Sequence, residues 1–374
     1  MATNPDQEAD WHRFDAKALQ GFAESLLLRA GLGAQPARVT AEVLVEGDLL
    51  GHSTHGLQLL APYLRDIASG HMRRDGAPAV VSDRGAAVTW DGDFLPGPWL
   101  VRSAMDLAFE RVAQHAVVTV AIRRSHHIAC LAAYLRLATE RGLMMLLSCS
   151  DPATGSVAPH GGIAGRYTPN PIAAGFPTDG DPVLIDISAS TTTNGMTARM
   201  NRAGDGRRLP GRWLVDAHGE ASDDPRVMAT DPPGAILPLG GIELGHKGFA
   251  LGLLVEALTS GLAGHGRADG EKGWGASVFL QVLDPQAFGG HDRFVRETGW
   301  LAAACRGAPV KPGNPPVRLP GERALRRRER QLADGVALHP EIMPALVPHA
   351  QRLAVDLPVV IERIEGIGKT PSPS

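Results

Sequence analysis

The sequence has few cysteines and no long hydrophobic run, and each absence excludes a class of protein. Its three cysteines, Cys130, Cys149 and Cys305, are odd in number and form no C-x-x-C pair, so a disulfide framework is not expected. No apolar stretch reaches the roughly 20 residues that a membrane span requires. The polar, acidic N-terminus lacks the apolar segment of a signal peptide, so we expect a cytoplasmic protein without a membrane partner.

The chain also lacks an excess of charge of either sign. Lysine and arginine number 37 against 40 acidic residues, and the only concentrated basic run covers residues 326–330. A protein that binds nucleic acid through its phosphates needs a broad basic face, so no nucleic-acid partner is expected. The 374 residues, of which 44% are hydrophobic, suffice for two or three domains or for one large domain with insertions.

Hydrophobic periodicity predicts a chain of mixed helices and strands. Apolar positions at helical spacing predict N-terminal helices, which are followed by a hairpin and then by alternating helices and strands. Several strands are continuous apolar runs, which favours a buried sheet in an α/β arrangement. The predicted helices cover residues 15–30, 37–50, 57–69, 98–115, 128–140 and 247–262, and the strands cover 79–82, 87–90, 117–122, 143–148, 183–187, 213–215 and 277–283.

The common nucleotide-binding motifs are absent. A Rossmann domain carries G-x-G-x-x-G between a strand and a helix, whereas the nearest match, at residues 264–270, is G-x-G-x-x-x-G and follows a helix. The chain has no P-loop sequence and no G-x-S-x-G nucleophile elbow. Generic motifs therefore leave the function open.

Histidines are concentrated in two short polar segments. Residues 51–56, GHSTHG, lie between two predicted helices, and residues 125–127, SHH, follow the predicted strand 117–122. The junction of a strand end with a helix N-terminus is a common ligand site, and histidine exchanges a proton near neutral pH. The alternative is that these histidines only cap helices or satisfy buried backbone groups.

A metal site is a further interpretation of the same histidines. His52 and His55 lie three residues apart, and with His126, His127 or Asp186 they supply enough ligands for a tetrahedral ion. The glycines that flank the first pair and the absence of an H-E-x-x-H motif count against this interpretation, so no metal ligand is expected. A histidine-based metallohydrolase remains an alternative enzyme class.

Six segments, two of which contain the histidines described above, follow one another in a recognisable order: GHSTHGLQLLAPY at residues 51–63, RSHH at 124–127, NPIA at 170–173, IDISAS at 185–190, LPLGGIELGHKGFAL at 237–251 and LPGE at 319–322. Together they resemble the type 2 malate/L-lactate dehydrogenase family, whose members are NAD(P)-dependent oxidoreductases without a Rossmann fold. Each segment alone is a weak signal, but the series spans about residues 10–340 and is specific.

The resemblance implies a mixed α/β fold in which a non-Rossmann NAD(P)-binding domain, with a largely antiparallel sheet, joins a helical domain built from both ends of the chain. It divides the chain into helical residues 1–75, a sheet-and-helix segment 76–125, the dinucleotide-binding domain 126–310, C-terminal helices 311–360 and a flexible tail 361–374. It also implies a homodimer, NAD or NADP as cofactor, and a small-molecule substrate, either a 2-oxo or 2-hydroxy acid or a cyclic imino acid.

The resemblance assigns roles to individual residues as well. The catalytic positions are His55, His127, Thr54 and Asp186. The substrate-binding positions are Tyr63 and Asn170. The cofactor-binding positions are Asp186, Ile187, Ser188, His246, Lys247, Gly321, Glu322 and Arg323.

The two catalytic histidines are expected to divide the work. His55 is predicted to be the proton donor, because Thr54 and Asp186 are expected to keep its ring oriented and protonated. His127 is predicted to open a helix whose dipole lowers its pKa, so that the neutral ring binds and polarises the substrate oxygen.

Four positions depart from the family pattern. Leu59 stands where the family has an arginine that binds the substrate carboxylate. The other three are Thr54, Ala129 and Pro169, which replace serine, glycine and threonine. Either the substrate is larger and less polar at that end, or another arginine substitutes, for which the candidates are Arg123, Arg124 and Arg166. A dinucleotide-binding protein that has lost its chemistry is a further alternative.

Overall fold

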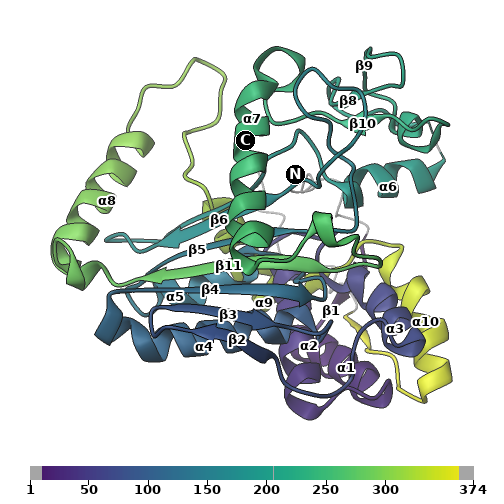
Figure 1. Ribbon diagram of the computed structural model, residues 1–374, viewed down its shortest axis with the longest axis horizontal. Helices are drawn as coiled ribbons and strands as arrows, with labels where there is room; N and C mark the ends of the chain where they lie inside the picture. Colours follow the sequence, from purple (N-terminus) through teal and green to yellow (C-terminus); the bar gives the residue numbers. More distant parts are fainter. Residues whose placement is uncertain (1–10, 205, 362–374) are drawn as a thin grey trace, which may run out of the picture.

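A mixed β-sheet lies at the centre of the computed structural model, which describes residues 11–204 and 206–361 (Figure 1). Its seven strands are β2 (Ala79–Asp83), β3 (Ala87–Asp91), β4 (Val117–Ser125), β5 (Met144–Ser150), β6 (Pro171–Phe176), β7 (Val183–Ser188) and β11 (Ala276–Leu283). Their order across the sheet is β2-β3-β4-β11-β5-β6-β7. The pair β3 and β4 is parallel and every other neighbouring pair is antiparallel, so the predicted mixed, largely antiparallel sheet is confirmed.

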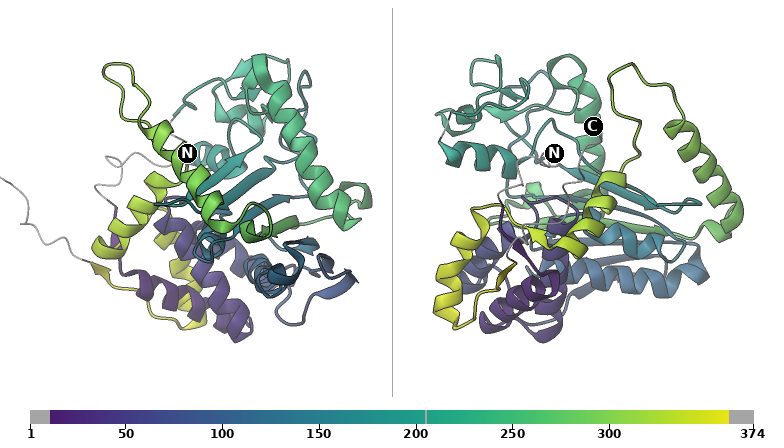
Figure 2. Two further views of the ribbon diagram at one scale, coloured as in Figure 1. Left: turned by 90° about the vertical axis from the view of Figure 1, so that its left-hand side faces the viewer. Right: turned by 180° about the vertical axis from the view of Figure 1, so that it is seen from behind.

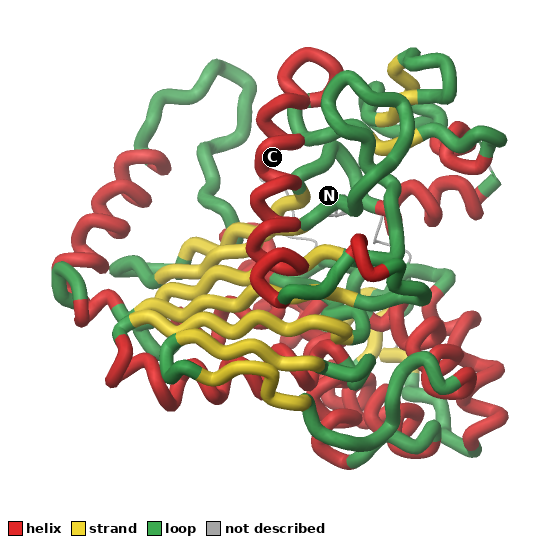
Figure 3. Tube along the Cα trace, in the orientation of Figure 1, coloured by secondary structure: helices red, strands yellow, loops and turns green. Residues whose placement is uncertain are grey.

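The α-helices of the described residues are α1 (Ala16–Arg29), α2 (Ala34–Leu49), α3 (Leu60–Ser69), α4 (Gly97–His115), α5 (Ala132–Thr139), α6 (Asn194–Ala203), α7 (Gly241–Glu256), α8 (His291–Arg306), α9 (Glu322–Asp334) and α10 (Ile342–Leu353). α4 and α5 cover one face of the sheet, and α7 lies over the other face (Figures 1 and 3). α2 packs against α4 and α5, while α9 and α10 pack against α1 to α3. The helical part therefore draws on both ends of the chain, as the family resemblance implies.

Short strands attach the outlying segments. In a three-stranded sheet, β1 (Arg13–Phe14) lies between β12 (Val336–Ala337) and β13 (Val360–Ile361), which joins the two ends of the described chain. A second small sheet holds β8 (Leu214–Val215), β9 (Ala221–Ser222) and β10 (Ala235–Ile236) beside α6. Apart from Ile361, the predicted tail 361–374 lies outside the described residues.

One hydrophobic core joins the helices to the sheet. Asp15 caps α1, because its carboxylate accepts a hydrogen bond from the Ala18 N–H at 2.8 Å. On β11, Val278, Leu280 and Val282 are fully buried between β4 and β5. The continuous apolar runs therefore become the central strands because helices cover both of their faces.

Two predicted helix boundaries are wrong. The predicted helix 128–140 begins only at Ala132, because Ala129 has a left-handed backbone (φ +61°) that a helix does not accommodate. The predicted helix 247–262 begins earlier, at Gly241, and its last part, Ala257–Gly261, is a π-helix, η4. Gly240 allows the early start, since its φ of +100° turns the chain into the helix.

No helix among the described residues combines the length and the apolar character that crossing a membrane requires.

Candidate active site

A cavity of about 500 Å³ opens at one end of the sheet. β5 and β7 end beside it and β6 and β11 begin beside it, so four strands contribute to its floor. Its walls include the loop 52–55 after α2, the loop before α5 that carries His127, and residues 193–196 at the start of α6. The two histidine segments that the sequence separates therefore face the same space.

A buried carboxyl group, that of Asp48, fixes the loop that carries His52 and His55. The Asp48 carboxylate accepts a hydrogen bond from the Leu57 N–H at 2.7 Å. A Cβ atom at Gly56 would overlap the Asp48 carboxyl group, so only glycine fits there. Burial raises the pKa of Asp48 to about 7, and Arg199 and Arg327 oppose that rise.

His55 is neutral in this environment. Burial lowers its pKa to about 4, and the neighbouring His52 lowers it further. The Thr54 hydroxyl lies 2.9 Å from His55 Nδ1, which orients the ring as predicted. The prediction that Asp186 keeps His55 protonated is wrong, because desolvation of the imidazolium dominates and Asp186 attracts His52 instead.

His127 carries its proton on the nitrogen remote from its own backbone. The Ala129 N–H donates to His127 Nδ1 at 3.2 Å, which makes Nδ1 an acceptor. The Tyr63 hydroxyl lies 2.9 Å from the same nitrogen and 3.1 Å from the His127 carbonyl oxygen, and it donates to one of these acceptors. A neutral ring with Nδ1 as acceptor has its N–H at Nε2. His127 therefore offers a hydrogen-bond donor at Nε2.

The low pKa of His127 has a different cause from the one predicted. The helix α5 begins five residues after His127, so its dipole does not act on the ring. Burial lowers this pKa well below its usual value, and the neighbouring His55 and His126 lower it further. The ring packs against Trp274 with a centroid distance of 4.5 Å, and lies 6.0 Å from the His55 ring. Two neutral imidazoles thus lie side by side.

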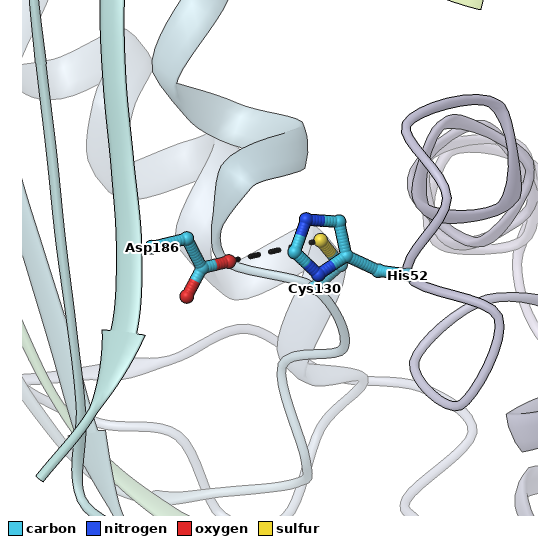
Figure 4. A group of neighbouring side chains, drawn as sticks. All are labelled: His52, Cys130 and Asp186. Atoms are coloured by element: carbon cyan, nitrogen blue, oxygen red, sulfur yellow. Dashed lines mark hydrogen bonds between the residues drawn. The ribbon is translucent and has the colours of Figure 1, made fainter. Parts of the chain in front are cut away.

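Asp186 lies on β7, and its partners are not His55 and His127, the two histidines predicted to be catalytic. Its carboxylate accepts a hydrogen bond from the Ala132 N–H at 2.9 Å, and the Cys130 thiol lies 3.9 Å from the same oxygen. The His52 ring lies beside both groups (Figure 4). Burial raises the pKa of Asp186 above its usual value, and attraction to His52 opposes that rise.

Only some of the predicted cofactor residues line the cavity. Asp186, Ile187 and Ser188 line the cavity, and Ser188 is the last residue of β7. His246 and Lys247 belong to α7 and do not line it. The remaining three, Gly321, Glu322 and Arg323, lie at the start of α9 and outside the lining as well.

The two predicted substrate residues differ in their placement. Tyr63 is fully buried and is absent from the cavity wall, and its hydroxyl contacts His127. Asn170 does line the cavity, but its amide already donates to the Gly252 carbonyl at 3.0 Å and to Glu256 at 2.9 Å. Its side chain therefore holds β6 against α7.

The arginines proposed to replace the missing family arginine lie elsewhere. Arg123 and Arg124 form ion pairs with Asp91 at 2.9 and 2.7 Å, and Arg166 is exposed. Leu59 itself lines the cavity. Among the lining residues in the described part of the chain, none is lysine or arginine.

Sequence reasoning missed the start of α6. Thr193 caps this helix by accepting a hydrogen bond from the Met196 N–H at 3.3 Å, and residues 193–196 line the cavity. The free backbone N–H groups of a helix N-terminus bind anions. Three consecutive threonines before Asn194-Gly195 were the available signal, because threonine is a preferred N-cap residue.

The fold and the site define an oxidoreductase of a recognised type. The structure of Δ1-piperideine-2-carboxylate reductase from Pseudomonas syringae pv. tomato matches with a TM-score of 0.78 and 28% identity, covering 90% of this chain and 99% of that one. Hydroxycarboxylate dehydrogenase B from Escherichia coli K12 is 28% identical over 92% of this chain and 95% of its own length. L-lactate dehydrogenase from Cupriavidus necator is 33% identical over 90% of this chain and 97% of its own length.

The family model for malate/L-lactate dehydrogenase matches residues 14–347. The chain belongs to the malate/L-lactate dehydrogenase family, and the resemblance carried by the six sequence segments is confirmed. Membership makes the protein an oxidoreductase with a small-molecule substrate and implies a nicotinamide dinucleotide as cofactor.

Both histidine rings are expected to be neutral at pH 6. A lowered folded-state pKa means that the unfolded chain binds the proton more readily, so stability should rise with pH between about 4 and 6.5 for His55. Ring ¹⁵N chemical shifts measured across this range, with His55→Gln and His127→Gln to assign the signals, report the ionisation directly. A midpoint near 6.5 for His55 would contradict the buried, neutral state.

Proposed function

We propose that the protein interconverts a small 2-oxo acid and the corresponding 2-hydroxy acid, or reduces a cyclic imino acid, with NAD or NADP. The relatives named as hydroxycarboxylate and lactate dehydrogenases and as an imino-acid reductase support these substrate classes. The observation that carries the proposal is the pair of neutral histidines with ring centroids 6.0 Å apart on the wall of one cavity. Each turnover of such a reaction moves one proton beside one hydride.

The described residues fit a dinucleotide at the strand ends and at α6. The first residues of α6 line the cavity, a position that suits a pyrophosphate because a helix N-terminus attracts anions, and Thr193 adds a hydroxyl. Asp186, Ile187 and Ser188 form the adjacent wall, where they would hold the ribose or the nicotinamide. The bound nicotinamide supplies or accepts the hydride. Lys247, which lies on α7 outside the lining, is not needed for this arrangement.

The histidines are suited to different tasks. His127 donates from Nε2 to the substrate oxygen, because the Ala129 N–H donates to its other nitrogen. His55, oriented by Thr54, accepts the hydroxyl proton when the alcohol is oxidised and returns a proton to the oxygen in the reverse direction. A neutral His55 is ready to act as base, so alcohol oxidation needs no prior ionisation. The retained histidines favour an active enzyme over a degenerate family member.

Removing either histidine should separate binding from turnover. His55→Gln should lower turnover by ~10²–10⁴-fold, the usual contribution of a general acid–base group. His127→Asn should lower it by ~10²–10³-fold, the usual effect of losing one oxyanion donor. The affinity of both variants for NADH or NADPH should stay within a few-fold of the wild-type value. Nicotinamide fluorescence measures this affinity.

His218→Gln is the matched control, because His218 lies outside the cavity lining. Activity is measured against a panel of 2-oxo acids and cyclic imines with each reduced dinucleotide. Failure of the wild type to bind either dinucleotide at near-millimolar concentration would refute the oxidoreductase proposal. Full turnover in both histidine variants would refute the mechanism alone.

The cavity lining offers few charged partners to the carboxylate of a substrate. Leu59 lines the wall, and the described lining offers no cationic side chain of lysine or arginine. A carboxylate there depends on helix N–H groups and neutral histidines, whereas an arginine binds it with two charge-assisted hydrogen bonds. The cavity therefore favours a substrate that is larger or less polar at this end than lactate or malate.

Leu59→Arg should lower KM for small 2-oxo acids by roughly tenfold or more, since charge-assisted hydrogen bonds are worth about 1.5–3 kcal/mol. Leu59→Met keeps the size without the charge and should leave KM unchanged. A thermal melt checks that both variants fold. An unchanged KM in a folded Leu59→Arg variant would show that the carboxylate lies away from residue 59.

We also propose a homodimer in a reducing, cytoplasmic location. The three cysteines are free thiols, which suits that compartment. Several large apolar side chains on α7 and on α8 are exposed. α8 projects from the rest of the molecule (Figure 2). Contiguous exposed apolar patches are typical of protein interfaces. The exposed side chains are Ile242, Leu244, Leu253, Leu254, Trp300 and Leu301.

Sedimentation at micromolar concentration should give a dimer, and the double variant Leu253→Glu/Leu254→Glu should give a monomer, because two buried charges oppose association. Val80→Glu is the control, since Val80 is also exposed but lies on the edge strand β2. A wild-type monomer would refute the proposal, and a dimer that survives the double variant would place the interface elsewhere.

A further inference from the structure

Three chemically different side chains meet on the cavity wall beside the two histidines already discussed. His52 comes from the loop after α2, Cys130 from the loop before α5 and Asp186 from β7 (Figure 4). One ligand atom from each, an imidazole nitrogen, a thiol sulfur and a carboxylate oxygen, lies within 4.8 Å of both others. The cluster differs from the His52 and His55 pair considered from the sequence, because His55 takes no part in it.

Nitrogen, sulfur and oxygen donors in this arrangement suit a zinc-type ion. Zinc binds such atoms at about 2.0–2.3 Å in a tetrahedron, so two ligand atoms of one ion are about 3.5 Å apart. The Cys130 sulfur is already 3.9 Å from the Asp186 oxygen. Only small side-chain movements would therefore complete three of the four coordination positions.

The ligand atoms are also available. Among the described residues, no hydrogen bond occupies the ring nitrogens of His52, and the Cys130 thiol has only its long contact with Asp186. The Ala132 N–H donates to the same Asp186 oxygen that lies near the Cys130 sulfur, and a carboxylate oxygen has a second lone pair for an ion. All three residues line the cavity, so a fourth ligand would reach the ion from the cavity.

We propose that His52, Cys130 and Asp186 bind a divalent, thiol-preferring metal ion of the zinc type on the cavity wall, and that the bound ion excludes the dinucleotide. Binding breaks the Sγ–H bond of Cys130 and releases its proton to solvent, while His52 and Asp186 contribute lone pairs and no electron is transferred. Exclusion follows because the ion engages Asp186, beside Ile187 and Ser188 of the proposed cofactor wall. This second half rests on the proposed function.

The metal site is tested with cobalt, which needs no dinucleotide. Full-length protein, freed of metal with a chelator, is titrated with Co²⁺. We expect one equivalent to produce a near-ultraviolet thiolate-to-cobalt band and the visible bands of a tetrahedral ion, both removed by Zn²⁺. Loss of a group that only hydrogen-bonds a metal ligand lowers metal affinity by about 10–100-fold. Because Cys130→Ser and His52→Gln each remove a direct ligand, each should lower cobalt affinity by more than ~100-fold.

Cys149→Ser is the matched control, because Cys149 lines the same cavity but lies outside the cluster. It should keep the cobalt bands, and thermal melts show whether all three variants fold. Absence of the thiolate band in the wild type, or its survival in Cys130→Ser, would overturn the metal site. If Cys130→Ser does not fold, His52→Gln takes its place, and an unchanged cobalt affinity in that variant would overturn the site in the same way.

Competition is tested separately by titrating NADH and NADPH with and without one equivalent of Zn²⁺. We expect zinc to weaken dinucleotide binding at least tenfold in the wild type and to have no effect in His52→Gln. Equal affinities with and without zinc would overturn the exclusion while the cobalt result stands. A metal-free protein that binds neither dinucleotide would refute the proposed function instead, and the cobalt titration would still decide the metal site.

Discussion

The position of the histidine loop depends on one buried carboxyl group. Asp48, near the end of α2, holds the Leu57 N–H and packs so closely under Gly56 that no side chain fits there. From α9, the Gln331 amide donates to two carbonyls at the end of α2, both at 2.9 Å. The end of α2, the loop that carries His55, and the C-terminal helices therefore form one unit. The cavity keeps its shape because burial leaves each of these polar groups few alternatives.

Burial also determines the chemistry of the site. The desolvation that accompanies a tightly packed loop favours the uncharged form of an imidazole, so both His55 and His127 are neutral side by side. Neutral rings have distinct nitrogens, and the backbone of residues 127–129 makes one nitrogen of His127 an acceptor and the other a donor. The same wall brings His52 to Asp186, which is why the proposed metal site and the proposed proton-transfer site lie next to each other.

The sheet was predictable because its central strands are buried on both faces and therefore appear as continuous apolar runs, at residues 117–122, 143–148 and 277–283. The order of the strands across the sheet was not predictable, because β11 lies between β4 and β5 although it follows both by more than a hundred residues in the chain. The predictions of the two helix starts near Ala129 and Gly240 were wrong for a local reason. Their positive φ angles interrupt or begin a helix without any change in hydrophobic pattern.

The family, the two histidine segments and the strand end at Asp186–Ser188 could be identified from the order of residues alone, because these short motifs keep their residue types and spacing. Which groups meet is a property of the folded chain. Folding pairs Asp186 with His52 and leaves His55 to Thr54, places Tyr63 against His127, and keeps Lys247 out of the cavity lining. Such partnerships join residues distant in the chain, and burial decides both their contacts and their charge, which no local pattern records.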